Sequence, residues 1–258
     1  SSLNSLVLTG GIPAYVNPGI HPELGIPLGM ALDDVVRAMD AHPEAKAVLV
    51  NNPTYYGVCP ALQEIIRIAH ERGMLVLADE AHGTHLYFGP DLPPAAMRCG
   101  ADLAAVSVHK TGGSLTQSSI LLANNPSVNP DRLRTTINLI QTTSASYLLM
   151  SSLDLARRTL ALEGNEIFAG VLDLARYARN EINAIGGYHA FARDIVNGNG
   201  CYAFDETKLS IHTLEIGLAG IEVSDLLREE YGIQIEFGDL GNILAILSMG
   251  DNAYMIER

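Results

Sequence analysis

The chain has 258 residues, of which 48% are hydrophobic and 17% charged, and its formal net charge is -13. These proportions are typical of a globular protein with a sizeable core and exclude an intrinsically disordered chain. No apolar run reaches the roughly 18 residues of a membrane span, and the acidic balance argues against binding nucleic acid through its phosphates.

The first half of the chain alternates helical and strand-like segments. We expect helices up to Leu8, from about Asp33 and over 61–72, because apolar residues recur there at helical spacing. Strand-like apolar runs lie over residues 14–17, 45–51, 74–79, 103–108 and 119–123. Strands that are separated by helices predict a mainly parallel sheet that helices cover on both faces.

Beyond residue 131 the pattern changes to long helices. Apolar residues at intervals of three and four predict helices over 147–163 and 166–185, and the second ends at Gly186-Gly187. Three short strand-like runs and one further helix follow, over 208–212, 233–237 and 243–248 for the strands and 223–231 for the helix. We therefore expect a large domain over 1–186 and the start of a small α+β domain over 187–258.

The cysteines and the chain ends give two further expectations. Cys59, Cys99 and Cys201 are odd in number and lack metal-ligand spacing, so we expect reduced thiols in a cytoplasmic protein and no metal site. The chain begins at Ser1 without Met or a signal sequence and stops at Arg258 soon after a strand-like run. We interpret it as a fragment that is incomplete at both ends.

One lysine and one aspartate stand at the ends of neighbouring strands. Lys110 follows the run over 103–108 and precedes two glycines, and Asp79 ends the run over 74–79. Strand ends that point the same way line one crevice in an α/β protein, so the two side chains are expected to meet around a single ligand. Pyridoxal phosphate needs an amine for its aldehyde and a carboxylate for its pyridine nitrogen. Ser107 and His109 add hydrogen-bond donors for its phosphate.

Taken one at a time, these residues have simpler interpretations. A lysine after a strand is usually a solvated charge, and an aspartate there usually belongs to a turn, so only their joint occurrence favours a site. Thr54 beside Pro53 is typical of a turn, and Tyr55 and Tyr56 are expected to pack rather than to act as acids or bases.

Four motifs carry a family resemblance: NPTYYG at 52–57, DEAHG at 79–83, SVHK at 107–110 and TTSASY at 142–147. Together they resemble the major domain of the Orn/Lys/Arg decarboxylases, from Ser1 to about Gly250. The resemblance implies the aspartate aminotransferase type of fold, which is fold type I of the pyridoxal-phosphate enzymes. In that fold a mainly parallel sheet lies between helices and is followed by a small α+β domain.

The resemblance also implies how the cofactor would be held. Lys110 would form the Schiff base with pyridoxal phosphate, and Asp79 would partner the pyridine nitrogen. Ser107 and His109 would contact the phosphate, and Ala81 would pack on one face of the ring.

Further roles follow from the same resemblance. His82 and Thr54 would lie near the ring hydroxyl, and His82 or the Schiff-base lysine would protonate the substrate carbon. Thr142 and Thr143 would reach the phosphate of a neighbouring subunit, because the site of this family lies at a dimer interface. Glu236 would meet the distal cation of the substrate, although a surface charge is an equally good interpretation of it.

The implied activity is decarboxylation of a basic amino acid, with arginine ranked before lysine and ornithine, in a homo-oligomer of at least two subunits. Two alternatives stay open. An aminotransferase on the same fold would need an arginine that clamps the substrate carboxylate, and Arg134, Arg157 and Arg158 lie in helical segments without such a signature. A non-catalytic remnant that binds a full-length relative is favoured by the absence, before Ser1, of the family's phosphate-binding loop and ring-stacking histidine.

Overall fold

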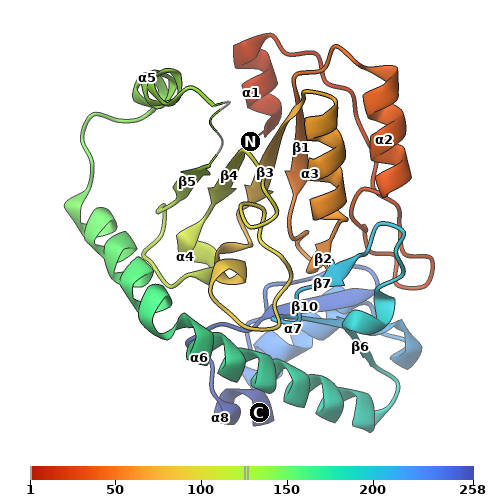
Figure 1. The fold of residues 1–258 in the computed structure, drawn as a ribbon. Helices are drawn as coiled ribbons and strands as arrows, with labels where there is room; N and C mark the ends of the chain where they lie inside the picture. Colours follow the sequence, from red (N-terminus) through yellow and green to blue (C-terminus); the bar gives the residue numbers. More distant parts are fainter. Residues whose placement is uncertain (1, 125, 127) are drawn as a thin grey trace.

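The first sheet of the computed structural model, which describes residues 2–124, 126 and 128–258, has four strands (Figure 1). In order across the sheet they are β1 (Ala47–Asn51), β3 (Leu75–Glu80), β4 (Leu103–Val106) and β5 (Ile120–Ala123). β1, β3 and β4 are parallel, and β5 is antiparallel to β4. The carboxyl ends of β3 and β4 therefore lie at the same edge of the sheet.

One face of this sheet is covered by α2 (Leu32–Ala41) and α3 (Leu62–Glu71). Alternate strand residues such as Val50, Val76 and Ala104 are buried against these helices. On the opposite face Leu49 and Leu121 keep 51% and 43% of their surface exposed. The covering that the sequence led us to expect on both faces is therefore complete only on the side of α2 and α3.

The second sheet is antiparallel and has a hydrophobic core of its own, separate from the core between the first sheet and α2 and α3. Its strand order is β6 (His189–Phe191), β8 (Lys208–His212), β10 (Asn242–Ile246) and β9 (Phe237–Gly238). The helices α6 (Tyr147–Ile185) and α7 (Gly220–Tyr231) supply the apolar side chains that pack on it. A short ladder of β2 (Val58–Cys59) with β7 (Ala203–Phe204) links the two halves of the chain.

The remaining helices are short. They are α1 (Ser2–Thr9), α4 (Val108–Thr111), α5 (Pro130–Ile140) and α8 (Ala253–Glu257), together with 3-10 turns at Thr84–Tyr87, Arg193–Ile195 and Leu214–Ile216. The side chain of Asn129 caps α5 by accepting the N–H groups of Asp131 and Arg132. Within the described ranges, none of the helices is both long and apolar enough to cross a bilayer.

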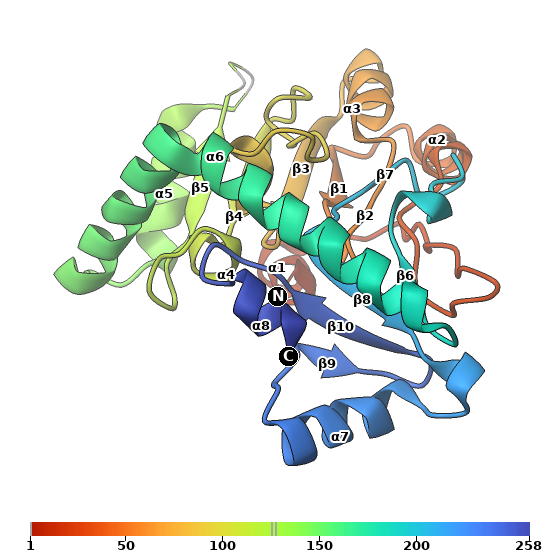
Figure 2. The same cartoon turned by 90° about the horizontal axis from the view of Figure 1, so that it is seen from below.

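The long helix α6 corrects one expectation. We predicted two helices with an interruption near Gly164, but a single helix runs from Tyr147 to Ile185 and crosses the molecule from α5 to β6 (Figure 2). A Cβ on Gly164 would lie 2.8 Å from the Cβ of Phe88. Gly164 therefore serves the close approach of another segment and does not end the helix.

Three strand predictions were also inaccurate. Residues 14–17 form no strand, because the neighbouring prolines cannot donate to a ladder and β1 stays at the edge of its sheet. The strand predicted over 103–108 ends at Val106, and residues 108–111 form α4. Of the run over 233–237 only Phe237 belongs to a strand. The domain boundary near residue 186 stays a prediction.

Candidate active site

Asp79 and Glu80 are neighbours at the end of β3 and point to opposite faces of the sheet, because side chains alternate along a strand. Glu80 is fully buried, and burial raises its pKa. Its carboxylate accepts hydrogen bonds from Asn52 Nδ2 at 2.9 Å, the N–H of Ala96 at 2.8 Å and the hydroxyl of Tyr87. These bonds fasten the strand end to the loops around it, so Glu80 has a structural role.

Asp79 is half-buried on the other, more open face of the sheet. The backbone N–H of Ala81 donates to its Oδ1 at 3.1 Å and holds the carboxylate in place. This bond leaves Oδ2 for a ligand, as the predicted partner of a pyridine nitrogen requires. Ala81 itself is half-buried, two positions further along the chain.

Lys110 lies on α4, which begins two residues after the end of β4. Its Nζ is 3.3 Å from Nε2 of His82, three residues beyond Asp79. The chain contains only three lysines. Lys46 lies just before β1, at the edge opposite the strand ends, and Lys208 is fully buried. Lys110 is thus the accessible amine at this edge of the sheet.

His82 meets Lys110 as a neutral ring. Burial, followed by the nearby cations Lys208 and Lys110, lowers the pKa of His82 to about 3. An ammonium can only donate, so Nε2 of the neutral ring accepts the hydrogen bond and the proton of the ring lies on Nδ1. His82 Nδ1 is buried and has no hydrogen-bond partner among the described residues.

Tyr55 connects His82 with Glu236. The ring centroids of Tyr55 and His82 are 4.4 Å apart, and the hydroxyl of Tyr55 donates to the carboxylate of Glu236. Burial and the bond to Glu236 raise the pKa of Tyr55 to about 12. Glu236 is otherwise exposed. Four side chains from distant segments thus form one continuous path from Lys110 to Glu236.

The two predicted phosphate contacts flank Lys110. The hydroxyl of Ser107 accepts from Ser119 Oγ at 3.4 Å, so its own proton can be donated to a ligand. His109 Nδ1 lies 2.9 Å from the backbone oxygen of Ser118, which leaves Nε2 for a ligand. Both side chains are half-buried.

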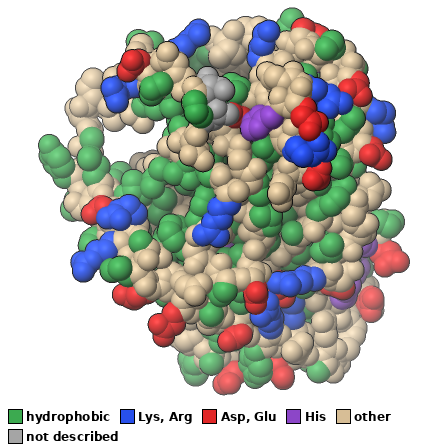
Figure 3. Space-filling view, viewed as in Figure 1, with side chains coloured by type: hydrophobic (Ala, Val, Ile, Leu, Met, Phe, Trp, Pro, Cys, Tyr) green, Lys and Arg blue, Asp and Glu red, His purple; other side chains and the backbone are tan. Residues whose placement is uncertain are grey.

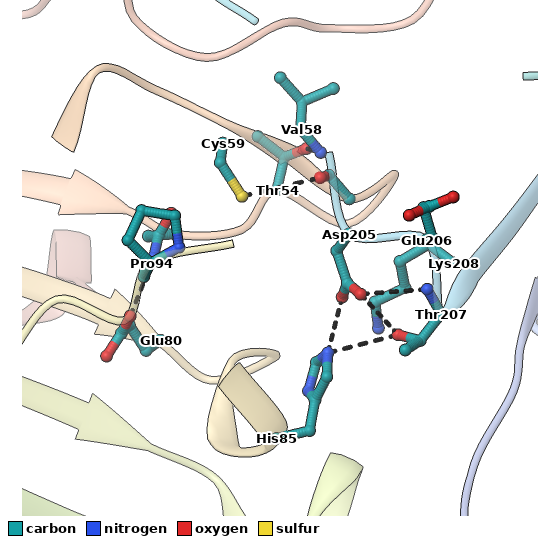
Figure 4. Close-up of polar contacts among 12 residues, drawn as sticks. Thr54, Val58, Cys59, Glu80, His85, Pro94, Asp205, Glu206, Thr207 and Lys208 are labelled. Carbon is teal, nitrogen blue, oxygen red and sulfur yellow. Dashed lines mark hydrogen bonds and ion pairs between the residues drawn. The ribbon is translucent and has the colours of Figure 1, made fainter. Parts of the chain in front are cut away.

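Thr54 has the local role that its position beside Pro53 suggests. Its Oγ1 accepts the backbone N–H of Val58 at 3.0 Å and closes the turn of the loop over 52–57 (Figure 4). The hydroxyl proton remains for a second partner, so the contact with a ring hydroxyl stays a prediction.

Thr142 and Thr143 lie apart from the other residues. They are exposed in the segment between α5 and α6, where Thr142 Oγ1 accepts the N–H of Ser144. This segment belongs to an arm, residues 130–150, that stands off the body of the molecule (Figures 1 and 3). Apolar side chains of the arm are exposed, among them Tyr147 at 82% and Leu148 at 77%.

A buried polar cluster surrounds His85 and Asp205 (Figure 4). His85 Nε2 is 2.8 Å from Asp205 Oδ2, and Thr207 Oγ1 donates to the other oxygen of Asp205 at 2.7 Å. Burial alone would raise the pKa of Asp205, but His85, Lys208 and Thr207 together outweigh it and the pKa falls to about 2. This cluster joins the turn after Asp79 to the segment that enters β8.

Lys208 follows this cluster as the first residue of β8. Its side chain is fully buried, and Nζ makes no hydrogen bond within the described part of the chain. Burial lowers the pKa of Lys208, while the fields of Asp205 and Glu236 act in the opposite direction. Its stem packs under Gly57, whose Cβ would lie 3.0 Å from Lys208 Cγ.

The profile of the family "Orn/Lys/Arg decarboxylase, major domain" matches residues 1–254. The chain belongs to this family. Two curated members are arginine decarboxylases, from Halalkalibacterium halodurans with 45% identity and from Bacillus subtilis with 44%. The matches cover 97% and 100% of this chain but 51% and 53% of those proteins, so the chain spans about half the length of the curated relatives it matches.

Solved decarboxylase structures confirm the predicted fold. Lysine decarboxylase A of Pseudomonas aeruginosa superposes with a TM-score of 0.82 at 20% identity, and the constitutive lysine decarboxylase of E. coli with 0.80 at 19%. Each comparison covers 99% of this chain and 42% of the other. The chain therefore has the fold type I architecture of the pyridoxal-phosphate enzymes, as the resemblance implied.

Two residues at the site were not recognised from the sequence. Tyr55 was expected only to pack, and its bond to Glu236 spans 181 positions of the sequence. Lys208 was not recognised either, although its place at the start of the strand-like run over 208–212 could have indicated a lysine inside the fold. Burial of its ammonium depends on the loop over 52–57, which sequence periodicity does not place.

Proposed function

We propose that this chain carries the cofactor and substrate site of a pyridoxal-phosphate decarboxylase that acts on a basic amino acid. Arginine ranks first, as in the curated relatives, and lysine and ornithine follow. The observation that carries the proposal is the hydrogen-bonded approach of Lys110 to His82, 3.3 Å, at the strand edge that also bears Asp79. The three unpaired cysteines are consistent with the predicted cytoplasmic location.

The residues at this edge fit pyridoxal phosphate. Lys110 offers an amine, Asp79 a carboxylate oxygen, and Ser107 and His109, which flank Lys110, offer polar atoms. Buried side-chain atoms without partners, within the described residues, also gather here: four of the six belong to His82, Thr84, His85 and Thr111. Such a concentration is expected where a polar ligand completes the hydrogen bonding.

The side chains divide the chemistry among them. When bound, pyridoxal phosphate would accept the electron pair that departing carbon dioxide leaves on the substrate. Asp79 would hold the proton on the pyridine nitrogen, and Ala81 would keep that carboxylate oriented. Lys110 is favoured over His82 as the donor that protonates the α-carbon, because a pKa of about 3 makes His82 a poor source of protons near neutral pH.

A second copy of the chain would complete the assembly. Four apolar side chains of the arm over 130–150 are between 73% and 82% exposed: Leu139, Ile140, Tyr147 and Leu148. Apolar side chains gathered on a projecting segment are typical of a surface that another subunit covers. We therefore favour a homodimer in which Thr142 and Thr143 act at the neighbouring site.

The aminotransferase alternative has less support. Arg134 and Arg157, two of the three arginines that could clamp a substrate carboxylate, pair with Asp131 and Asp154 on their own helices. Both pairs are largely exposed. They stabilise helices and give no reason to expect a carboxylate clamp.

The full-length protein with added pyridoxal phosphate tests the proposal. Release of carbon dioxide from arginine, lysine and ornithine would be compared with transfer of the amino group to a keto acid. Carbon dioxide release that Lys110→Ala abolishes and Lys46→Ala leaves intact is expected. Amino transfer without carbon dioxide would favour the aminotransferase, and neither activity would favour the non-catalytic remnant.

A further inference from the structure

The two ends of the candidate site are joined by a single aromatic side chain. At one end Lys110 Nζ meets His82 Nε2 at 3.3 Å, and at the other the exposed carboxylate of Glu236 accepts the hydroxyl of Tyr55. Between them the rings of His82 and Tyr55 are 4.4 Å apart with an interplanar angle of 59°. Tyr55 is therefore in contact with both ends.

The Tyr55 side chain is 40% exposed and is held by its contacts with two other rings and with Glu236. Phe237, the residue after Glu236, lies 5.4 Å from the Tyr55 ring between centroids. The loop that carries Tyr55 is closed by the hydrogen bonds between Thr54 and Val58. An aromatic side chain has two rotatable bonds, so a ring held in this way places its hydroxyl with little freedom.

Glu236 has binding capacity beyond Tyr55. An ionised carboxylate accepts about four hydrogen bonds, and the tyrosine hydroxyl uses one of them. The carboxylate is exposed, so a ligand can reach its remaining lone pairs. The buried Lys208 lies within electrostatic range of both Glu236 and Lys110, because the charges of both residues affect its pKa. The exposed lone pairs of Glu236 are therefore available to a cationic ligand group.

We propose that Tyr55 is a specificity-determining residue, which sets the length of the basic side chain that the site accepts by fixing Glu236 at a constant separation from Lys110. The inference rests on the proposed function, because Lys110 marks where the α-amino group reacts and Glu236 where the distal cation binds. A carboxylate in a fixed place discriminates between guanidinium and ammonium groups on chains of different length. A carboxylate whose position varies can bind cationic groups on chains of any of these lengths.

The chain offers a matched control in the next residue. Tyr56 also donates its hydroxyl to a carboxylate, that of Asp239, and its ring also packs against Phe237 at 5.5 Å. Tyr56 makes no contact of this kind with His82 or Glu236. Tyr55→Phe and Tyr56→Phe thus remove the same kind of bond, one inside the path from Lys110 to Glu236 and one outside it.

The test measures kcat/KM of the full-length, cofactor-loaded protein for arginine, lysine and ornithine. The preference is the ratio of kcat/KM for the best substrate to kcat/KM for each of the other two. Tyr55→Phe is expected to reduce this ratio about tenfold, mainly through a change in KM. Tyr56→Phe should leave the preference within about twofold. An unchanged preference in Tyr55→Phe, or an equal loss for all three substrates, would overturn the inference. Failure of the unmodified protein to decarboxylate any of them would overturn the proposed function instead.

A double-mutant cycle tests independently whether Tyr55 acts through Glu236. Glu236→Gln keeps an acceptor for the Tyr55 hydroxyl but removes the charge. Because Tyr55 is argued to act through Glu236, adding Tyr55→Phe to Glu236→Gln should change the substrate preference by less than about twofold. Independent effects that multiply in the double variant would contradict the proposal.

Discussion

Lys110 Nζ lies 3.3 Å from His82 Nε2, and the ring of His82 accepts that hydrogen bond. His82→Phe keeps an aromatic ring against Tyr55 but removes the acceptor, so the amine loses its orientation. We expect kcat to fall roughly 10²-fold, the size of effect that misplacing a reacting group produces. Steady-state decarboxylation kinetics measure kcat. His42 is exposed, and the control variant His42→Phe should leave kcat unchanged.

The pH profile of the same enzyme gives an independent check. Since the pKa of His82 is about 3, this ring does not change its charge between pH 5 and pH 8. An acidic limb near pH 6 that disappears in His82→Phe would show that the ring titrates there, which is incompatible with a neutral His82 as the acceptor.

Replacing the buried Lys208 by Met should stabilise the fold. The ammonium is fully buried without a hydrogen bond within the described residues, so its removal relieves a desolvation penalty of about 1–3 kcal/mol at pH 7. Chemical denaturation measures the change, with Lys46→Met near the start of β1 as the matched control. A loss of stability would reveal that the charge of Lys208 is well compensated.

The stability of the unmodified protein should also depend on Lys208 at high pH. Burial lowers the pKa of Lys208 below its usual 10.5. Between the folded and unfolded pKa values the unfolded chain binds more protons, so the free energy of unfolding rises with pH toward 10.5. Lys208→Met should flatten that rise in denaturation curves recorded at a series of pH values.

The buried pair of His85 and Asp205 should behave differently from an exposed pair of the same kind. Asp205→Asn removes the carboxylate from a fully buried contact and is expected to cost about 3 kcal/mol. His189 and Asp194 form a largely exposed pair at 2.7 Å, so Asp194→Asn should cost less than about 1 kcal/mol. Equal losses in thermal or chemical unfolding would count against the structural role of the buried cluster.

The sign of the pH effect follows from the lowered pKa of Asp205. The carboxyl group has a folded pKa of about 2 and an ordinary value of 3.8. Its contribution to stability is therefore present above pH 3.8 and is lost as the pH falls through about 2. Asp205→Asn should lack this acid-dependent part of the unfolding free energy.

Gly57 is expected to resist substitution because of Lys208 and Asp205. Its φ is +95°, and an added Cβ would lie 2.9 Å from the backbone oxygen of Asp205. Gly198 also has a positive φ, +71°, but nothing within 4 Å of its Cβ position. Both alanine variants should carry a backbone strain of about 1–2 kcal/mol, and only Gly57→Ala an additional steric penalty. Similar losses in the two variants would refute the close contact.

Local patterns in the sequence predicted most of the fold. The helix over Leu62–Glu71 and the strand before Asp79 follow from helical periodicity and from a short apolar run, which are properties of neighbouring residues. The gap between the helices predicted over 147–163 and 166–185 is absent, because Gly164 is small to accommodate Phe88, 76 positions away in the chain. A glycine that accommodates another segment has the same local appearance as one that ends a helix.

Some residues of the site could likewise be predicted from the sequence, and others could not. Asp79 and Lys110 were predicted together because parallel strand ends share an edge, which is a rule of topology. The contact of Tyr55 with Glu236, and the burial of Lys208 under Gly57, depend on how the second sheet docks on the loops of the first. No local pattern encodes that docking, so these residues became visible only in three dimensions.

Borohydride reduction of the full-length protein with bound pyridoxal phosphate, followed by peptide mapping, tests the central claim most directly. Within this chain the label can fall on only three lysines, and peptide mapping separates them from lysines elsewhere in the full-length protein. The label is expected on Lys110 and should disappear in Lys110→Arg. A label on Lys46 or Lys208, or none at all, would contradict the proposed role of Lys110 as the Schiff-base lysine.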